Sequence, residues 1–171
     1  MSDTLNFLTF QNPSQGELLF GQVLSEVVKF MTADPHARYK VMIGSDSNGV
    51  PVLDLVSVIA IHRIGNGGRY FWYRQSREGV KTLRQKIYNE VTTSLELATL
   101  FLPAFREELR KSESHTELPF DFEIHVDVGT KGETRDLIRE VTGMVRGYGY
   151  EVMVKPLSAA ATSFADRHVR F

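Results

Sequence analysis

The sequence predicts an α/β fold with a mixed five-stranded sheet of order 3-2-1-4-5, helices on both faces and an extra N-terminal helix. Three apolar segments between residues 39 and 74 are rich in β-branched and aromatic residues and are joined by short turns, which is typical of an antiparallel meander. Two later strand segments each follow a segment of helical periodicity. A helix between two strands makes a crossover connection, so the fourth and fifth strands should lie beside the first and run parallel to it.

Composition limits the class of protein. The chain has 171 residues, 42% of them hydrophobic, which is enough for a full core. It contains no cysteine, so disulfides and thiol nucleophiles are excluded. A net charge of -1 argues against binding nucleic acid by bulk charge. The sequence shows neither a signal-peptide pattern nor an apolar run long enough to span a bilayer, so we expect a cytoplasmic protein without a membrane partner.

The first predicted element is an amphipathic helix. Ser14 and Glu17 have the spacing of a capping box, and apolar residues follow at helical intervals as far as Met31. This helix ends near Pro35. We therefore expect residues 1–38 to form a helical extension packed on a main domain that spans residues 39–171.

The meander opens with a strand that ends at an acid. The apolar run from Lys40 leads directly to Asp46, and a tight turn follows at Asn48. The chain returns through residues 53–63, reverses at a glycine-rich turn and continues through residues 69–74. Asp46 is a candidate ligand at the edge of the sheet, although an Asp after a strand often bonds the turn backbone instead.

The second half of the chain alternates helices and strands. A helix is expected from about Val80 to Leu102, where Pro103 weakens or ends it, followed by a solvated connection. A strand over residues 120–129 again ends near an acid, Asp127. The remaining expected elements are a helix over residues 132–147, a strand over residues 150–155 and a last helix over residues 158–170.

The predicted topology gathers carboxylates at one end of the sheet. The first and fourth strands are neighbours, so Asp46 and Asp127 should lie side by side, where their repulsion calls for a cation. On the first long helix, Glu90 falls on the apolar stripe and Glu96 does not. Asp166 of the last helix can approach the same end.

Two of these acids have plainer alternatives. If the helical wheel is rotated by one position, Glu90 lies on the flank of the helix with Lys86. Asp166 could instead form an ion pair with Arg167 or Arg170 on a solvated face.

Basic and aromatic residues alternate between residues 55 and 89, where Glu78 is the only acid. Such interleaving suits a phosphate backbone with stacked bases. The candidate nucleic-acid contacts are Trp72, Arg74, Arg77 and Lys81. The alternative is a solvated hairpin whose aromatic side chains pack inward.

The motifs together resemble a known family. The acids at Asp46, Glu90, Asp127 and Asp166, in this order of strands and helices, resemble the ribonuclease H-like superfamily. More closely, GSDS at residues 44–47, DVG at 127–129, GYGY at 147–150 and VKP at 154–156 look like the YkuK family of bacterial proteins, which are predicted ribonuclease H-like nucleases. The likeness extends from about residue 39 onward.

This resemblance implies two-metal hydrolysis of phosphodiester bonds in RNA, an RNA/DNA hybrid or structured DNA. Asp46, Glu90, Asp127 and Asp166 would be both the catalytic residues and the ligands of Mg²⁺ or Mn²⁺, with Asp46 bridging the two ions. Two alternatives remain: a non-catalytic ribonuclease H-like module that binds nucleic acid or protein through the basic, aromatic hairpin, and a structural partner protein that binds no nucleic acid.

Overall fold

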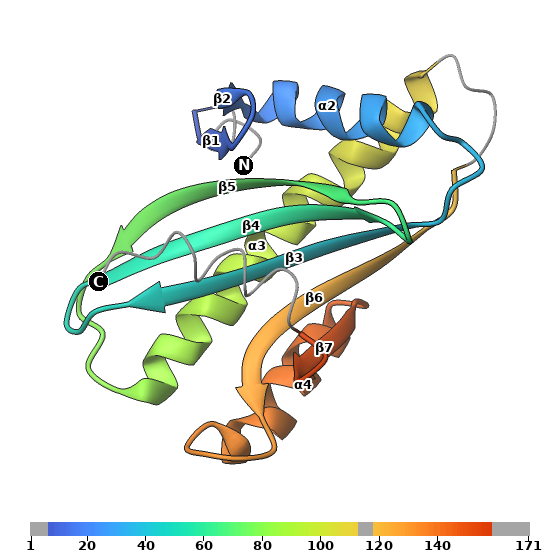
Figure 1. Cartoon of the computed structure of the whole chain (residues 1–171). Helices are drawn as coiled ribbons and strands as arrows, with labels where there is room; N and C mark the ends of the chain where they lie inside the picture. The colour runs from blue at the N-terminus through green and yellow to red at the C-terminus, as the bar shows by residue number, and fades with distance from the viewer. Residues whose placement is uncertain (1–6, 113–117, 159–171) are drawn as a thin grey trace.

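The computed structural model describes residues 7–112 and 118–158, and its centre is a single mixed sheet. The sheet has seven strands, not the five predicted, in the order β2-β1-β5-β4-β3-β6-β7 (Figure 1). The strands are β1 (Thr9–Asn12), β2 (Gly16–Leu19), β3 (Tyr39–Asn48), β4 (Leu53–Arg63), β5 (Gly68–Arg77), β6 (Phe120–Gly129) and β7 (Glu151–Lys155).

The two unpredicted strands form a hairpin at the β5 edge, so the complete strand order differs from the predicted one. The capping-box spacing of Ser14 and Glu17 predicts a helix that begins just after Ser14, but helix α2 begins only at Phe20 (Phe20–Thr32). Asn12 explains the difference, because its Oδ1 accepts hydrogen bonds from the backbone N–H groups of Ser14 and Gln15, each at 3.0 Å. Ser14 therefore lies in a turn and caps no helix.

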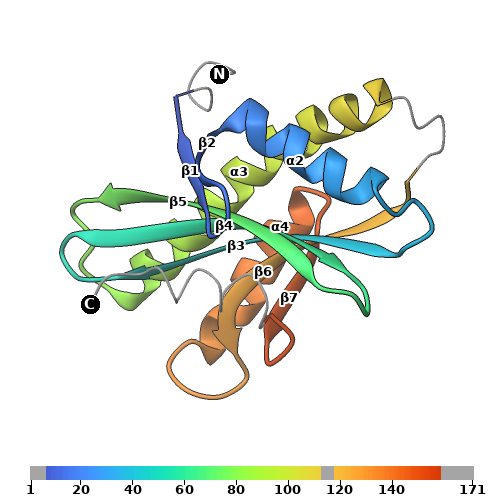
Figure 2. The ribbon, with the colours of Figure 1, turned by 45° about the horizontal axis from the view of Figure 1, so that its top comes forward.

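The hairpin joins the sheet through one strand pair and a side-chain hydrogen bond from Asn12 Nδ2 to the Tyr70 carbonyl at 3.0 Å. Gln11 of β1 pairs with Trp72 of β5, and no other pair links these two strands in the described part of the chain. Figure 2 shows the hairpin crossing β5 steeply. The hairpin also leads directly into α2, so it fixes where that helix enters the fold.

Strand β3 lies at the centre of the sheet. It pairs antiparallel with β4 along its whole length and parallel with β6 from Tyr39↔Phe120 to Gly44↔His125. No pair joins β3 and β6 beyond Gly44, and the pairing of β6 with β7 shifts register between Val126 and Gly129. The parallel strands thus separate at their C-terminal ends, and this fork positions the candidate site.

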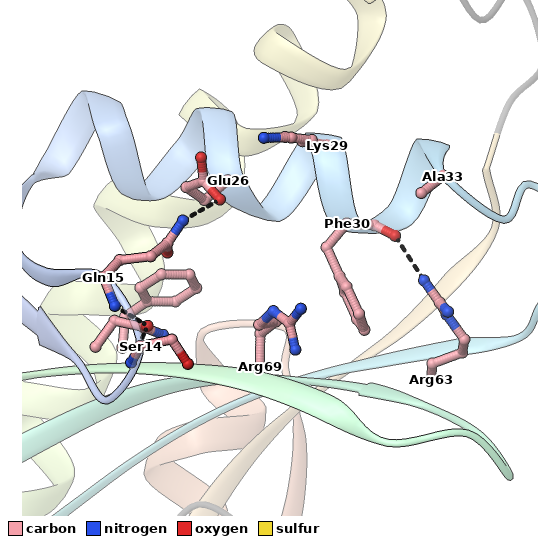
Figure 3. Close-up of a pocket in the computed structure, with 10 residues that line it drawn as sticks. Ser14, Gln15, Glu26, Lys29, Phe30, Ala33, Arg63 and Arg69 are labelled. Carbon is pink, nitrogen blue, oxygen red and sulfur yellow. Dashed lines mark hydrogen bonds between the residues drawn. The ribbon is translucent and has the colours of Figure 1, made fainter.

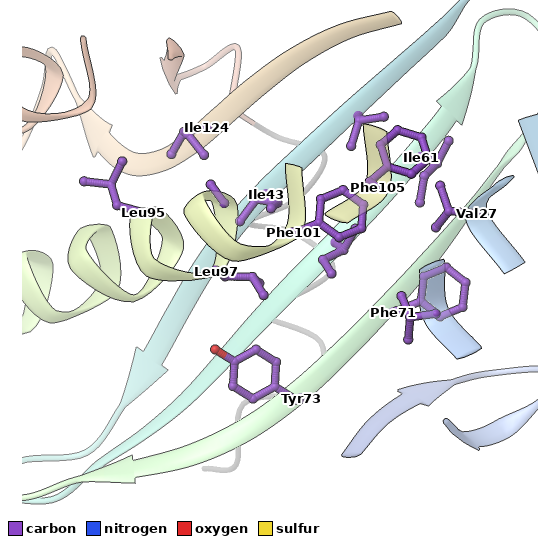
Figure 4. Packing of buried hydrophobic residues seen from close by; sticks show 14 of the residues in the cluster. Val27, Ile43, Ile61, Phe71, Tyr73, Leu95, Leu97, Phe101, Phe105 and Ile124 are labelled. Atoms are coloured by element: carbon purple, nitrogen blue, oxygen red, sulfur yellow. The ribbon is translucent and has the colours of Figure 1, made fainter. Parts of the chain in front are cut away.

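Three helices cover one face of the sheet. Helix α2, helix α3 (Leu83–Lys111) and helix α4 (Ile138–Gly147), which a short 3₁₀ turn η1 (Arg135–Leu137) precedes, all contribute to one hydrophobic cluster. Figure 4 shows α3 side chains such as Leu95 and Phe101 facing Ile43 and Ile61 of the sheet. The predicted helices on both faces are therefore found on one face in the described residues, and the expected last helix lies outside them.

Helix α3 is longer than predicted. Pro103 was expected to weaken or end it, yet the helix continues to Lys111 with Pro103 inside. Phe101, Leu102 and Phe105 are all buried around the proline. Their burial offsets the roughly 3 kcal/mol that an interior proline costs.

The opposite face of the sheet carries a second, smaller apolar cluster. Met42, Val56, Val58 and Ala60 form it, and Tyr70 and Trp72 pack against them. Among the described helices, none is long and apolar enough to cross a membrane.

Candidate functional site

Asp46 and Asp127 lie at the fork between β3 and β6, two residues beyond the last parallel pair. Ser45 and Ser47 face helix α3, so strand alternation directs Asp46 to the opposite face of the sheet. Val126 and Val128 belong to the cluster under the helices, so Asp127 also points to the opposite face. Both aspartates are half-buried. The two acids predicted to be neighbours thus occupy adjacent strand ends on one face.

Glu90 approaches the fork from the helix side. Its side chain is 3% exposed, and Ser47 donates a hydrogen bond to Glu90 Oε1 at 2.6 Å. Lys86 Nζ lies 3.9 Å from the same oxygen. The pKa of Glu90 is raised to about 8, chiefly by burial and to a smaller extent by the negative charges of Asp46 and Asp127, against the opposing effects of the Ser47 hydrogen bond and Lys86. The three carboxyl groups therefore act on one another electrostatically.

The orientation of helix α3 agrees with the helical wheel. Glu90 faces the sheet, whereas the side chain of Glu96 is 59% exposed and lies 3.7 Å from Arg77. The start of the helix is fixed by Thr82, whose hydroxyl accepts the backbone N–H of Gln85 at 3.1 Å, while the Gln85 side chain accepts the N–H of Thr82. This capping box sets the register that turns Glu90 inward.

Lys155 is a residue of the site that the sequence analysis missed. Its Nζ lies 2.6 Å from Asp127 Oδ1. It reaches this position because β7 pairs with the end of β6 at Gly129, where a Cβ would lie only 3.3 Å from the Lys155 Cβ. A lysine that ends the strand next to a candidate acid was the available signal.

A buried polar cluster occupies the same face of β6. His125 Nε2 lies 3.0 Å from Glu123 Oε2, and Lys40 Nζ lies 2.7 Å from Glu123 Oε1. The Lys40 and His125 contacts together hold the pKa of Glu123 below its usual range, although burial opposes them. His125 Nδ1 is buried and has no hydrogen-bond partner among residues 7–112 and 118–158. Glu123 was also missed, although it alternates in phase with Asp127.

Serine hydroxyls join helix α3 to the strands beneath it. Ser94 Oγ lies 2.9 Å from Ser45 Oγ and donates to the Glu90 carbonyl at 2.9 Å, and Ser45 Oγ lies 2.8 Å from Ser57 Oγ. All three serines are buried. Small hydroxyl side chains allow the helix to approach β3 closely, and their hydrogen bonds hold Glu90 against Ser47.

The described residues contain no group of three His, Asp or Glu side chains arranged to hold a metal ion. Two aspartates lie on one face of the sheet, while Glu90 is bonded to Ser47 on the other. Asp166, the fourth predicted ligand, lies outside the described residues.

The four residues predicted to contact nucleic acid do not all lie on the same face of the sheet. Arg74 shares a row across the sheet with Asp46 through Val56, on the same face and about 10 Å away. It forms an ion pair with Asp54 at 2.8 Å, and its guanidinium lies 6.0 Å from the Trp72 ring.

The other two candidates, Arg77 and Lys81, lie at the C-terminal end of β5 and in the loop between β5 and α3. Arg77 approaches Glu96 as described above. Lys81 is exposed and forms an ion pair with no described residue, and its backbone N–H donates to Gln85 Oε1 at 2.7 Å. Trp72 and Arg74 therefore share a face with the aspartates, whereas Arg77 and Lys81 continue toward helix α3.

Comparison with known proteins identifies the family. A sequence model described as ribonuclease H-like matches residues 22–170. The uncharacterized protein YkuK of Bacillus subtilis (strain 168) is 31% identical over 170 residues, which cover 94% of this chain and 96% of the relative. No solved structure matches significantly. The chain belongs to the YkuK family of ribonuclease H-like proteins.

Proposed function

We propose that this protein is a metal-dependent nuclease that hydrolyses phosphodiester bonds of RNA, an RNA/DNA hybrid or structured DNA, with its active site at the fork between β3 and β6. The observation that carries the proposal is the placement of Asp46 and Asp127 at adjacent strand ends on one face of this fork, with the buried Glu90 approaching from the helix side. Membership of the ribonuclease H-like family supports the same reaction class.

The donor chemistry of the fork fits Mg²⁺ or Mn²⁺. Hard divalent cations prefer carboxylate oxygens, and Asp46 and Asp127 offer them on one face of the fork, while Glu90, bonded to Ser47, approaches from the other face. When bound, such ions activate water and stabilise the leaving oxygen. Asp166 is proposed as a fourth ligand.

The chain's own residues supply positioning. Ser47 holds the Glu90 carboxyl by a 2.6 Å hydrogen bond. The hydrogen bonds of Ser45 with Ser94 and Ser57 hold helix α3 close to β3 and β4. Lys155 gives Asp127 a positive neighbour in the absence of other cations. In the proposed working site, Lys155 moves from Asp127 toward a phosphate of the substrate.

The substrate is proposed to lie on the face of the sheet that carries both aspartates. Arg74 and Trp72 lie on this face beside Asp46, and they offer a cation and an aromatic ring for a phosphate and a base. Arg77 and Lys81 would extend the contact along the strand.

Calorimetric titration with Mn²⁺ and cleavage of labelled RNA, hybrid and DNA substrates test this proposal together. Asp46→Asn and Asp127→Asn should each abolish cleavage and lower Mn²⁺ affinity at least tenfold. Asp121→Asn is a matched control, because Asp121 is an exposed aspartate of the same strand and face as Asp127 but lies near the other end. Equal cleavage by the Asp127→Asn and Asp121→Asn variants would contradict the proposal.

A non-catalytic nucleic-acid-binding module is the second candidate function. One observation favours it: Lys155 lies against Asp127 and Lys86 lies near Glu90, so two of the acids already have cationic neighbours. This candidate predicts nucleic-acid binding that Arg74→Gln weakens and Asp46→Asn leaves unchanged, with no cleavage by any variant. Filter binding with the same labelled strands distinguishes the two functions.

A further inference from the structure

A cavity lined by several charged side chains lies far from the fork. It has a volume of about 400 Å³ and lies between helix α2, the β1–β2 turn and strand β5 (Figure 3). Pockets of 300–1,000 Å³ are typical of sites for small organic ligands. Arg63, which lines it, pairs with Tyr39 at the opposite end of β3 from Asp46. Tyr39, beside the cavity, and Asp46, at the fork, are seven residues and therefore about 23 Å apart along β3.

The cavity carries an excess of positive charge. Lys29, Arg63 and Arg69 line it, against one carboxylate, Glu26. None of these three cations forms an ion pair with a carboxylate anywhere in residues 7–112 or 118–158. Glu26 instead accepts a hydrogen bond from Gln15 Nε2 at 2.6 Å. These three positive charges therefore have no carboxylate partner among the described residues.

The two guanidinium groups are held in place by an aromatic ring. The Phe30 ring lies between the Arg63 and Arg69 side chains (Figure 3), at 4.4 Å and 5.1 Å from their guanidinium carbons. Arg63 is further fixed because it donates to the Phe30 carbonyl at 3.0 Å and to the Tyr39 hydroxyl at 3.2 Å. Stacking restricts both side chains, so less conformational entropy remains to be lost when a ligand binds.

Two like charges beside one ring repel each other, and a bound anion would relieve the repulsion. Guanidinium groups match the geometry of phosphate oxygens, and a lysine adds a third cation. The Ser14 hydroxyl and the half-buried Phe30 ring extend the lining beyond the charges. The volume exceeds what a bare phosphate ion fills, so the phosphate should carry an organic group.

The geometry points to a binding site for a phosphate monoester, held by Arg63, Arg69 and Lys29 in the cavity between α2 and β5. Two sources share this chemistry, a free nucleotide and the 5′-phosphate end of a nucleic-acid strand. The inference does not depend on the proposed nuclease activity, because no residue of the fork lines the cavity.

Calorimetry at constant ionic strength tests the site, with the full chain and four probes: inorganic phosphate, a nucleoside 5′-monophosphate, and one short oligonucleotide with a 5′-phosphate or a 5′-hydroxyl. Arg69→Gln should lower the affinity for the nucleotide at least tenfold, because Arg69 is exposed and its loss leaves the core intact. Arg146→Gln, an exposed arginine on α4 with the same charge change, should lower it less than twofold. Lys29→Gln provides a second variant that does not touch the core.

The results separate clearly. Preference for the free nucleotide supports a small-molecule site, and preference for the 5′-phosphorylated strand over its 5′-hydroxyl form supports an end-binding site. Absence of binding by the unaltered protein would overturn the inference. Equal weakening by Arg69→Gln and Arg146→Gln would also overturn it, because binding would then follow net charge. The Asp46→Asn variant should bind the nucleotide normally, which separates this test from that of the nuclease.

Discussion

Glu90 is a buried carboxyl group whose proton competes with any bound cation. Because its pKa is about 8, the side chain is mostly neutral at pH 7 in the absence of metal. A cation at the fork would have to displace this proton. Metal affinity should therefore rise with pH through the pKa of Glu90.

The raised pKa also makes the stability of the metal-free protein depend on pH. The ordinary pKa of 4.5 applies to the unfolded chain, so between about pH 4.5 and pH 8 the folded state retains a proton that the unfolded state loses. The free energy of unfolding should thus be highest below pH 4.5, as far as this group is concerned, and fall as the pH rises to 8.

Urea denaturation at a series of pH values, with chelator present, measures this dependence. Glu90→Gln should flatten the decrease, because glutamine does not titrate, and Glu96→Gln should leave it unchanged, because Glu96 is exposed. If the free energy of unfolding decreased with pH equally in the unaltered protein and the Glu90→Gln variant, the prediction would be wrong.

Lys155 makes a second prediction at the level of a single residue. Its ammonium group lies 2.6 Å from Asp127 Oδ1 and should compete with a metal ion for that oxygen. Lys155→Met keeps the aliphatic chain that packs on Gly129 and removes the charge. Mn²⁺ affinity should increase, by about tenfold for a difference of about 1.4 kcal/mol. Lys131→Met, an exposed lysine in the loop after β6, is the control and should change affinity little. Weaker Mn²⁺ binding by Lys155→Met would contradict the competition.

At the scale of the element, helix α3 connects the hydrophobic core to the fork. Its C-terminal half packs Phe101 and Phe105 under the sheet, and its N-terminal half carries Glu90. Pro103 interrupts the backbone hydrogen bonding between residues that are otherwise tightly packed.

Pro103→Ala should therefore stabilise the protein. The substitution restores a backbone donor at an exposed position, and we expect the free energy of unfolding to rise by about 1–3 kcal/mol in urea denaturation. Thr99→Ala, also exposed on the same helix, should change it by less than about 1 kcal/mol. Destabilisation by Pro103→Ala would mean that the proline sets a bend on which the packing depends.

At the scale of the whole molecule, the strands at the centre of the sheet are paired more extensively than the β1–β2 hairpin at its edge. Strands β3 and β4 are paired on both sides and buried along most of their length, whereas β1 is attached to β5 by one strand pair and one side-chain hydrogen bond. Amide hydrogen exchange should therefore be slowest in β3 and β4 and much faster in β1 and β2. Equal protection of the hairpin and β3 would show that α2 and the hairpin open only with the whole sheet.

Much of the fold followed from local patterns. The five strands β3 to β7 and the helices between them were expected from alternation, periodicity and turn residues, and in the sheet β5, β4, β3, β6 and β7 are consecutive neighbours. The hairpin was not expected, because residues 9–19 carry a weak strand pattern and a sequence that also fits a helix cap. Only the turn closed by Asn12 distinguishes the two structures.

The candidate site was predictable in part for the same reason. The sequence by itself determined that Asp46 and Asp127 end neighbouring strands and that Glu90 faces inward, since alternation and the helical period are local properties. Only the tertiary structure decided that Lys155 meets Asp127, that Ser47 bonds Glu90, and that Arg63 and Arg69 flank Phe30. These contacts depend on strand register, on the fork and on the seating of α2, which arise when distant segments pack together.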